Sequence, residues 1–328
     1  MRPQRVCWEA TLSFNRRQLI SIADLDDDDL LRLVHRGRDF AADPTGAGPV
    51  LSGCVVGTYF RVTSTRTRTA FTSGALRLGA SVISYGPDDL QLNTGESVAD
   101  TAAVFARMLD GLVARTAGGT PELRAFGSQQ QMGFVNAMSA EEHPTQALAD
   151  LTTLLQHFGT LDGLRVLYVG EGNNTAAALA LACARLPRCE LQLRTPPGYG
   201  LAAGIRQSAS AAAAAEDGAR IHEQHDMHEL PDAVDVIYTT RWQTTGTTKP
   251  DPAWREAFEP FRVDDALMAR YPDAVFMHDL PAHRGQEVTA SVLDGRASIA
   301  FRQAENKLYS AMAVLEWSLA GDCDRGVC

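Results

Sequence analysis

Three short stretches of this sequence carry side chains suited to binding an anion and polarising a carbonyl group. Ser64-Thr65-Arg66-Thr67-Arg68 combines hydroxyls with guanidinium groups, while His143-Pro144-Thr145-Gln146 and His278-Asp279-Leu280-Pro281 add imidazole, amide and carboxylate groups. Hydroxyls and a guanidinium beside the unpaired N–H groups of a helix start form a phosphate cradle. The sequence therefore predicts a site for a phosphate-bearing ligand. The alternatives are ordinary helix caps: a surface arginine beside a hydroxyl cap in the first stretch, and a capping or core histidine in the second.

The elements that must position these side chains alternate between strand and helix. β-branched and aromatic residues predict a strand at 54–62, and apolar residues at helical spacing predict a helix at 65–78. Further strands are predicted at 80–84, 112–115, 164–169, 191–195, 234–239 and 274–277, and further helices at 98–112, from 144 onward, at 176–185 and at 301–319. This alternation predicts an α/β fold with parallel sheets. Because ligands bind beyond the carboxyl ends of such strands, the three stretches are expected to meet at one site.

The composition narrows the range of functions. The chain has 328 residues, of which 45% are hydrophobic, so about two packed domains are expected. No apolar run reaches the roughly 18 residues of a membrane span, and residues 1–10 lack a signal-peptide core. We therefore expect a cytoplasmic protein without a membrane partner. The net charge of −10 argues against a nucleic-acid partner, because nucleic acids bind to positively charged protein surfaces.

The cysteines give no indication of a disulfide framework or a zinc site. The six residues contain no C-x-x-C pair, and in a chain of this length we expect most of them to be reduced and structural. Cys323 and Cys328 lie close together near the C-terminus, so a pair or a metal site there is the alternative.

The chemistry-bearing stretches resemble the aspartate/ornithine carbamoyltransferase family. The matching motifs are STRTR at 64–68, GESVADT at 95–101, the arginine of LVART at 115, HPTQALADLTT at 143–153, VGEGNN at 169–174 and MHDLPAHRGQEV at 277–288. Their order and spacing fit over residues 19–319. Members of this family move a carbamoyl group from carbamoyl phosphate to an amine. The resemblance implies the same reaction without a metal or other cofactor, two α/β domains with parallel sheets, and a homotrimer with active sites between subunits.

The resemblance also implies roles for individual residues. Residues 1–150 would bind carbamoyl phosphate, completed by the C-terminal helix at 301–320, and residues 151–300 would bind the second substrate. The catalytic set would be Arg66, Thr67, Arg115 and His143. Carbamoyl phosphate would be bound by Ser64, Thr65, Arg66, Thr67, Gln91, Arg115, His143, Gln146 and Lys307. The second substrate would be bound by Asn174, Thr240, Arg241, Gln243, Thr244, Asp279 and Leu280.

Gln91 and Lys307 need further comment, the first because its role requires a neighbouring subunit and the second because it departs from the family motif. Gln91 stands where ornithine-type members reach into a neighbouring subunit's site, although a solvated loop glutamine is the alternative. Thr94 stands where aspartate-type members carry a lysine, which favours the ornithine-like branch for this loop. Lys307 replaces an arginine of the family's E-N-R stretch, so the charge is kept and the guanidinium fork is lost.

The second-substrate motifs depart further from the ornithine-type pattern. Where those members have D-x-W-x-S-M-G, this chain reads TRWQTTG at 240–246, and Asp279 replaces the cysteine of their HCLP. The T-R-x-Q order of 240–243 resembles the carboxylate-binding stretch of aspartate-type members, although their HPLPR is absent. Arg241 offers a fork for a carboxylate, and Asp279 offers a partner or proton acceptor for an amine. We therefore predict a small amino acid-like acceptor other than ornithine. The alternatives are a surface arginine at 241 and a capping carboxylate at 279.

Weaker patterns point to other functions. Gly170-x-Gly172 after a strand resembles a dinucleotide loop, but the third glycine and the acidic residue are out of register. His222, His225 and His228 would fan around a helix instead of converging on a metal, so no metal site is predicted. Two alternatives stay open: ornithine carbamoyltransferase itself, and a non-catalytic ligand-sensing relative. An amine screen with carbamoyl phosphate distinguishes them.

Overall fold

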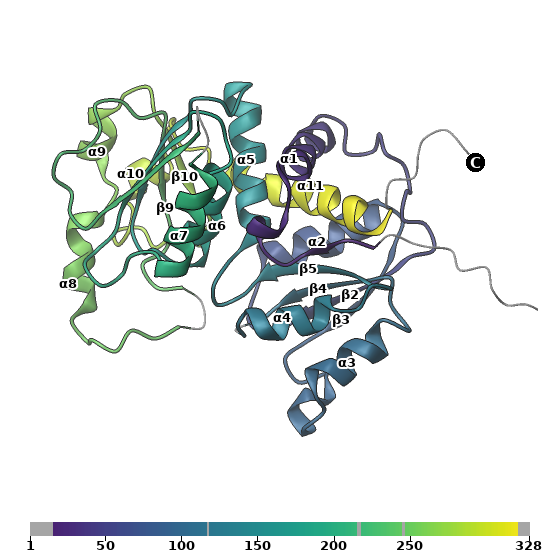
Figure 1. Ribbon diagram of the computed structural model, residues 1–328. Coiled ribbons are helices and arrows are strands. Elements are labelled where there is room, and N and C mark those ends of the chain that lie inside the picture. The colour runs from purple at the N-terminus through teal and green to yellow at the C-terminus, as the bar shows by residue number, and fades with distance from the viewer. Residues whose placement is uncertain (1–15, 117, 215–217, 245–246, 321–328) are drawn as a thin grey trace, which may run out of the picture.

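Two α/β domains lie side by side in the computed structural model, which describes residues 16–116, 118–214, 218–244 and 247–320 (Figure 1). Each domain contains a five-stranded sheet, with the strand order β1-β5-β4-β2-β3 in the first and β10-β9-β6-β7-β8 in the second. All strand pairs within both sheets are parallel. The predicted fold class is therefore confirmed.

The first sheet is covered by helices on both faces. Its strands are β1 (Gln18–Leu19), β2 (Val55–Phe60), β3 (Ser81–Tyr85), β4 (Gly111–Arg115) and β5 (Gly133–Met138). The surrounding elements are α1 (Asp27–Ala42), α2 (Arg66–Arg77), α3 (Val98–Phe105), α4 (Thr120–Gly127), α5 (Pro144–Phe158) and the 3₁₀ turns η1 (Ile22–Asp24) and η2 (Gln91–Thr94). Side chains alternate along β4: Val113 enters the core shared with α1, α2 and α5, while Leu112 enters the core under α3 and α4. Burial on both faces explains the continuous apolar character of this strand.

The second sheet has the same construction. Its strands are β6 (Arg165–Val169), β7 (Glu190–Arg194), β8 (Arg220–Gln224), β9 (Val236–Thr239) and β10 (Val275–His278). Its helices are α6 (Asn174–Cys183), α7 (Ala203–Ala212), α8 (Trp254–Phe258), α9 (Asp265–Arg270) and α10 (Ala290–Leu293), with the turn η3 (Glu259–Phe261). All ten residues of α6 are buried, which fits a helix that is apolar on every side.

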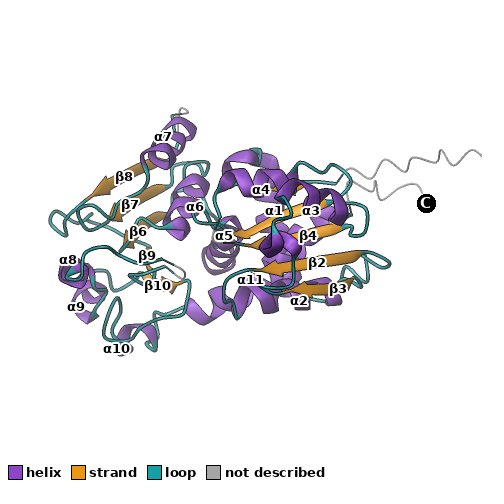
Figure 2. Ribbon diagram, turned by 90° about the horizontal axis from the view of Figure 1, so that it is seen from below, coloured by secondary structure: helices purple, strands orange, loops and turns teal. Residues whose placement is uncertain are grey.

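Two helices join the domains. The last helix, α11 (Ala300–Leu319), starts beside β10 and then packs against α1, α2 and α5 of the first domain (Figures 1 and 2). The boundary predicted between residues 150 and 151 falls inside α5, which runs unbroken to the left-handed Gly159. The site residues carried by α5 and α11 are therefore held by both domains.

Several predicted elements differ from the structure. The helix expected at 98–112 ends at Phe105, and the chain then turns so that Asp110 accepts the Val55 amide (2.8 Å) just before β4 begins. The strands β5 and β8 and the helix α4 were not predicted. β8 is a polar strand at the edge of the sheet, and its alternation of charged and apolar residues is too weak to indicate a strand. Within the described residues, no helix combines the length and apolar character needed to cross a membrane.

Candidate active site

A cavity of about 270 Å³ opens between the two domains at the carboxyl ends of their strands. Both domains contribute to its wall, and the backbone carbonyl of Leu280 accepts a hydrogen bond from Arg66 Nη2 (2.6 Å) across it. The predicted site residues in this wall are Ser64, Thr65, Arg66, Thr67, Arg115, His143, Gln146, Asn174, Thr240, Arg241, Thr244, Asp279, Leu280 and Lys307. The three stretches predicted to meet thus do lie around one cavity.

The start of α2 forms one end of the cavity. β2 ends at Phe60, and α2 begins at Arg66 after a short turn. The Ser64 hydroxyl accepts the Arg68 amide (3.3 Å), which ties the turn to the first helical residues. Arg68 itself stacks its guanidinium over the Phe60 ring (5.0 Å) and does not line the cavity. Arg66 is therefore the guanidinium of this turn that reaches the cavity, together with the positive end of the helix dipole.

Arg115 and His143 form the buried floor beside this turn. Arg115 ends β4 and donates from Nη1 to the Thr67 hydroxyl (3.4 Å). Burial, followed by the charge of Arg66, lowers the pKa of Arg115 to about 10, so the guanidinium stays charged at neutral pH. Burial, with the charges of Lys307, Arg115 and Arg66, lowers the pKa of His143 well below its usual range. His143 is therefore a neutral imidazole among cations.

Lys307 reaches the same floor from α11. Its ammonium donates to the Gln146 side-chain oxygen. Burial lowers the pKa of Lys307 to about 8; Asp279 and Asp150 oppose this shift, and Arg66 and Arg115 add to it. Its charge is thus weakly held in the unliganded protein, and an anionic ligand would stabilise it.

A buried hydrogen-bond network orients Gln146 from behind. Asp150 accepts hydrogen bonds from Gln146 (2.7 Å), from Gln303 on α11 (2.7 Å) and from the Tyr238 hydroxyl (2.9 Å). Burial raises the pKa of Asp150 to about 6, although these hydrogen bonds oppose the shift. Sequence reasoning missed this group. The spacing could have indicated it, because Asp150 lies one helical turn after Gln146, on the same face of α5.

The opposite wall comes from the loops after β6, β9 and β10. Asn174 starts α6. Its side-chain amide donates to the backbone carbonyl of Ser139 (2.7 Å), and its backbone carbonyl accepts a hydrogen bond from the backbone N–H of His143 (3.1 Å). The Thr240 hydroxyl is bonded to Tyr168 (2.8 Å) and to Asn173 (3.0 Å). These contacts join the second-domain wall to the residues that hold His143.

Arg241 and Asp279 carry the opposite charges of this wall. Arg241 Nε donates to the Gln243 carbonyl (2.8 Å), and Asp279 accepts a hydrogen bond from the Thr175 hydroxyl (3.0 Å). His278 lies behind Asp279 and accepts the Leu280 amide (2.8 Å), which fixes the turn. The charged residues around the cavity can therefore bind a carboxylate and a cationic or nucleophilic nitrogen in addition to a phosphate.

Two predicted binding residues lie elsewhere in this chain. Gln243 turns away from the cavity, donates to the Thr247 carbonyl (2.6 Å) and lines a neighbouring hollow. Gln91 lies on the exposed turn η2, where it accepts the Thr94 hydroxyl (2.7 Å). Gln91 is thus exposed in the single chain, and its contact with a neighbouring subunit stays a prediction.

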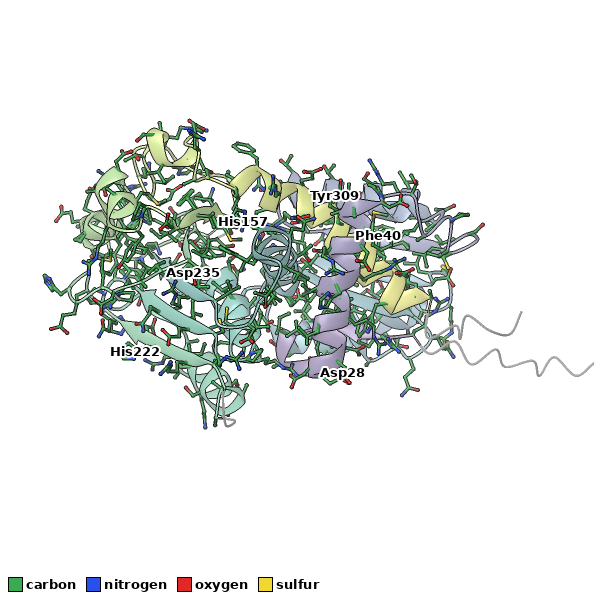
Figure 3. The ribbon with its side chains drawn as sticks, turned by 90° about the horizontal axis from the view of Figure 1, so that it is seen from above. Asp28, Phe40, His157, His222, Asp235 and Tyr309 are labelled. Carbon is green, nitrogen blue, oxygen red and sulfur yellow. The ribbon has the colours of Figure 1, made fainter. Side chains whose placement is uncertain are left out.

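The weaker motifs have structural explanations. Gly172 packs so closely on the backbone of Gly200 that an added Cβ would lie 2.3 Å away, and Asn173 caps α6. His222 lies on β8 at the edge of the second sheet, not on a helix (Figure 3). Across the described ranges, no cluster of three or more histidine, cysteine or acidic residues has the arrangement of a metal site. Cys54, Cys183 and Cys189 are free thiols, while Cys323 and Cys328 lie outside the described residues.

Comparison with known proteins agrees with this geometry. Two family models match: the carbamoyl-P binding domain of aspartate/ornithine carbamoyltransferase over residues 17–156, and the Asp/Orn binding domain over residues 162–318. The ornithine carbamoyltransferase of Methanothermobacter thermautotrophicus is 38% identical over 93% of this chain and 99% of that protein. That of Gloeobacter violaceus is 35% identical over 93% and 96%. The solved ornithine carbamoyltransferase of Pyrococcus furiosus superposes with a TM-score of 0.88 at 34% identity, covering 94% of this chain and 99% of that one.

Proposed function

The chain belongs to the aspartate/ornithine carbamoyltransferase family of transferases, and from this premise we propose that it carbamoylates a small amino acid-like amine. Carbamoyl phosphate would supply the carbamoyl group, and the products would be a ureido compound and phosphate. One observation carries the proposal. The cationic first-domain residues that suit carbamoyl phosphate share a single cavity with Arg241 and Asp279, which suit a carboxylate and an amine.

Carbamoyl phosphate would occupy the end of the cavity at α2. The phosphate would bind at the α2 turn, with Ser64, Thr65, Arg66 and Thr67, and Lys307 would add a second cation from α11. Arg115 lies beside Thr67, so its guanidinium can bridge phosphate and carbonyl. Gln146 would hold the carbamoyl end, with its orientation fixed by Asp150 and Lys307. A dianion is stabilised in such a site by several preorganised cations.

The reaction forms an N–C bond and breaks the bond between the carbamoyl carbon and the phosphate oxygen. A neutral amine attacks the carbonyl carbon, and negative charge develops on the carbonyl oxygen. Thr67, Arg115 and His143 would donate hydrogen bonds that stabilise this oxyanion. The Thr145 hydroxyl contacts His143 Nδ1 (3.3 Å). If the hydroxyl donates there, the imidazole carries its proton on Nε2 and can donate it to the oxyanion.

The acceptor must lose a proton for the reaction to complete. A free alkyl ammonium has a pKa of roughly 10, and the cations around the cavity favour its neutral form. Asp279 is the carboxylate of the second-domain wall, and it can accept this proton while the phosphate leaves. Arg241 would hold the carboxylate of the acceptor, with Asn174, Thr240, Thr244 and the Leu280 carbonyl completing the subsite.

Ornithine is the second candidate acceptor. The names of the related proteins favour it, since those from Methanothermobacter and Gloeobacter are called ornithine carbamoyltransferases. The substitutions at Thr240, Thr244 and Asp279 favour a different amine.

A panel of amines with carbamoyl phosphate tests the proposal. Phosphate release and the mass of the ureido product would be measured together, and reactions without amine or without protein would measure background hydrolysis. We expect amine-dependent formation of a ureido product. Binding of carbamoyl phosphate without carbamoylation of any amine would contradict the enzyme assignment for this chain.

We also propose a cytoplasmic homotrimer whose active sites lie between subunits. The support is that three apolar side chains of the first domain, Ile83, Val104 and Met108, are 43%, 44% and 72% exposed in the single chain. Such side chains are suited to burial against a second copy. We also propose that the carbamoyl phosphate domain ends at about residue 150 and is completed by α11. Sedimentation at micromolar concentration measures the assembly.

A further inference from the structure

The charged residues around the cavity are strongly unbalanced. Among the described residues that line it, Arg66, Arg115, Arg241 and Lys307 are cationic, and Asp279 is the one acidic side chain. Carbamoyl phosphate would neutralise about two of the positive charges. A third, Arg241, suits a carboxylate. With Asp279 as its one carboxylate, the described lining of the cavity can neutralise a single ammonium group.

A second carboxylate lies near the cavity, but its charge is already used. Glu171 forms a salt bridge with Lys249, whose side chain is only 4% exposed. The Lys249 ammonium also lies over the rings of Tyr199 (4.5 Å) and Phe258 (4.8 Å). Separating such a buried pair is strongly unfavourable, because it leaves an uncompensated charge. Glu171 is consequently not available to a substrate ammonium.

The end of β9 offers no charge either. The Thr240 hydroxyl is 2.8 Å from the Tyr168 hydroxyl and 3.0 Å from the Asn173 amide, so its hydrogen-bonding capacity is largely satisfied. Burial raises the pKa of Tyr168 well above its usual range, and this phenol remains neutral. An ammonium placed here would lose its hydration without gaining an ionic partner.

Asp279 belongs to the reacting end of the cavity. It precedes Leu280, whose backbone carbonyl accepts a hydrogen bond from Arg66 Nη2 (2.6 Å). It also lines the same cavity as Arg115 and Lys307, which with Arg66 are proposed to hold carbamoyl phosphate. A carboxylate in this position is suited to the nucleophilic nitrogen. It cannot at the same time bind a second ammonium at the far end of the acceptor.

From this arrangement we propose that the acceptor has one carboxylate and one reactive amine, and no second ammonium. Its α-nitrogen is either absent, as in an ω-amino carboxylate, or acylated, as in a diamino acid joined through an amide. The inference rests on the proposed carbamoyl transfer and names its substrate class.

Three acceptor series test this inference with the full chain and carbamoyl phosphate. The first contains free diamino acids from diaminopropionate to lysine. The second contains the same compounds acetylated at the α-nitrogen, and the third contains the matching ω-amino carboxylates. At the best chain length, we expect kcat/KM to be about tenfold or more higher in the second or third series than in the first. The comparison between the second and third series distinguishes an acylated α-nitrogen from an absent one.

The failures of the two proposals are distinguishable. If a free diamino acid is the best acceptor, the inference is wrong and the proposed function stands. If carbamoyl phosphate binds in calorimetry but the second and third series are both inactive, the inference is also wrong. If carbamoyl phosphate does not bind and no series gives a ureido product, the proposed function itself fails.

Variants at Thr240 and Lys249 provide a second test. Thr240→Asp adds a carboxylate at the end of β9, and the nearly isosteric Thr240→Asn is its uncharged control. Thr240→Asp should shift the preference toward free diamino acids by about tenfold relative to Thr240→Asn. Lys249→Met, which unpairs Glu171, should shift it in the same direction. Equal preferences in the Asp and Asn variants, if both are folded, would contradict the charge argument.

Discussion

The two walls of the cavity differ in the elements that carry them. The wall proposed to bind carbamoyl phosphate, called here the carbamoyl phosphate wall, consists of the first turns of α2 and α5, the end of β4 and the middle of α11. The acceptor wall consists mainly of loops that follow β9 and β10. On the first wall, the motif residues of the family are kept except at Lys307. On the second, Thr240, Thr244 and Asp279 differ from the motif expected of ornithine-type members.

This difference indicates how the fold separates chemistry from specificity. Oxyanion stabilisation requires donors held to within a fraction of an ångström, which helices and buried networks provide. Recognition of the acceptor depends on which charges the loops present, and loops tolerate substitution. A change of acceptor therefore needs few substitutions and no rearrangement of the carbamoyl phosphate wall.

The largest expected effect is on the carbamoyl phosphate wall. Arg66→Ala removes a guanidinium aimed at a dianion, and we expect a loss of about 2–4 kcal/mol of transition-state stabilisation, roughly a 30- to 900-fold loss of kcat/KM. Calorimetry should show weaker binding of carbamoyl phosphate, and the melting temperature should change little. Arg77→Ala, in the exposed last turn of the same helix, is the matched control. Unchanged affinity in Arg66→Ala would contradict the assignment of this wall.

On the acceptor wall, a combined substitution should increase one activity instead of abolishing it. Asp279→Cys, Thr240→Asp and Thr244→Ser together restore the ornithine-type pattern, so turnover of ornithine should rise and turnover of the natural amine should fall. Each change in specificity should be about 1–3 kcal/mol, the effect of one unpaired polar group. Gln243→Ser, in the same loop but outside the cavity, should alter kcat/KM less than twofold.

Ornithine turnover by the natural protein sets the limit of this prediction. If the unmodified chain makes citrulline with a kcat/KM of about 10⁴ M⁻¹s⁻¹ or more, the substitutions are neutral variation around an ornithine site.

Lys307 should make the carbamoyl phosphate wall sensitive to pH. Its pKa is lowered by burial to about 8, so the unliganded protein loses this positive charge as the pH rises above 8. Affinity for carbamoyl phosphate should then fall up to about tenfold between pH 7 and pH 9. Lys307→Arg keeps its charge over this range and should abolish the decline. Calorimetry at several pH values measures both proteins, and an equal decline in the two would rule out this role of Lys307.

The last prediction concerns sites between subunits. Arg66→Ala and Gln91→Ala, each weakly active, should regain activity when mixed and reassembled, because some sites then combine an intact Arg66 with an intact Gln91. Random assembly gives about a quarter of the sites this combination. No recovery after confirmed subunit exchange, or sedimentation as a monomer, would contradict a shared site.

Much of this architecture was predictable because it is local. The strand before residue 64, the helix after it and the proline-started α5 follow from residue type and spacing over fewer than about twenty positions. Local patterns failed where partners are remote. The helix expected to continue to residue 112 ends at Phe105, and Asp110 instead exchanges hydrogen bonds with Val55 of β2. β8 carries too little apolar character to be recognised.

The pattern of residues along the chain was enough to predict the turn at 64–68, the fold class and the order of the chemical groups. Which of these groups meet depends on the packing of the folded chain. Arg66 contacts the Leu280 carbonyl, and Lys307 contacts Gln146, across 214 and 161 positions of the chain. Gln243 belongs to an acceptor motif yet turns out of the cavity, and Glu171 is neutralised by Lys249. Contacts of this range depend on how helices and sheets pack, because periodicity fixes which face of an element a side chain occupies but not what that face meets.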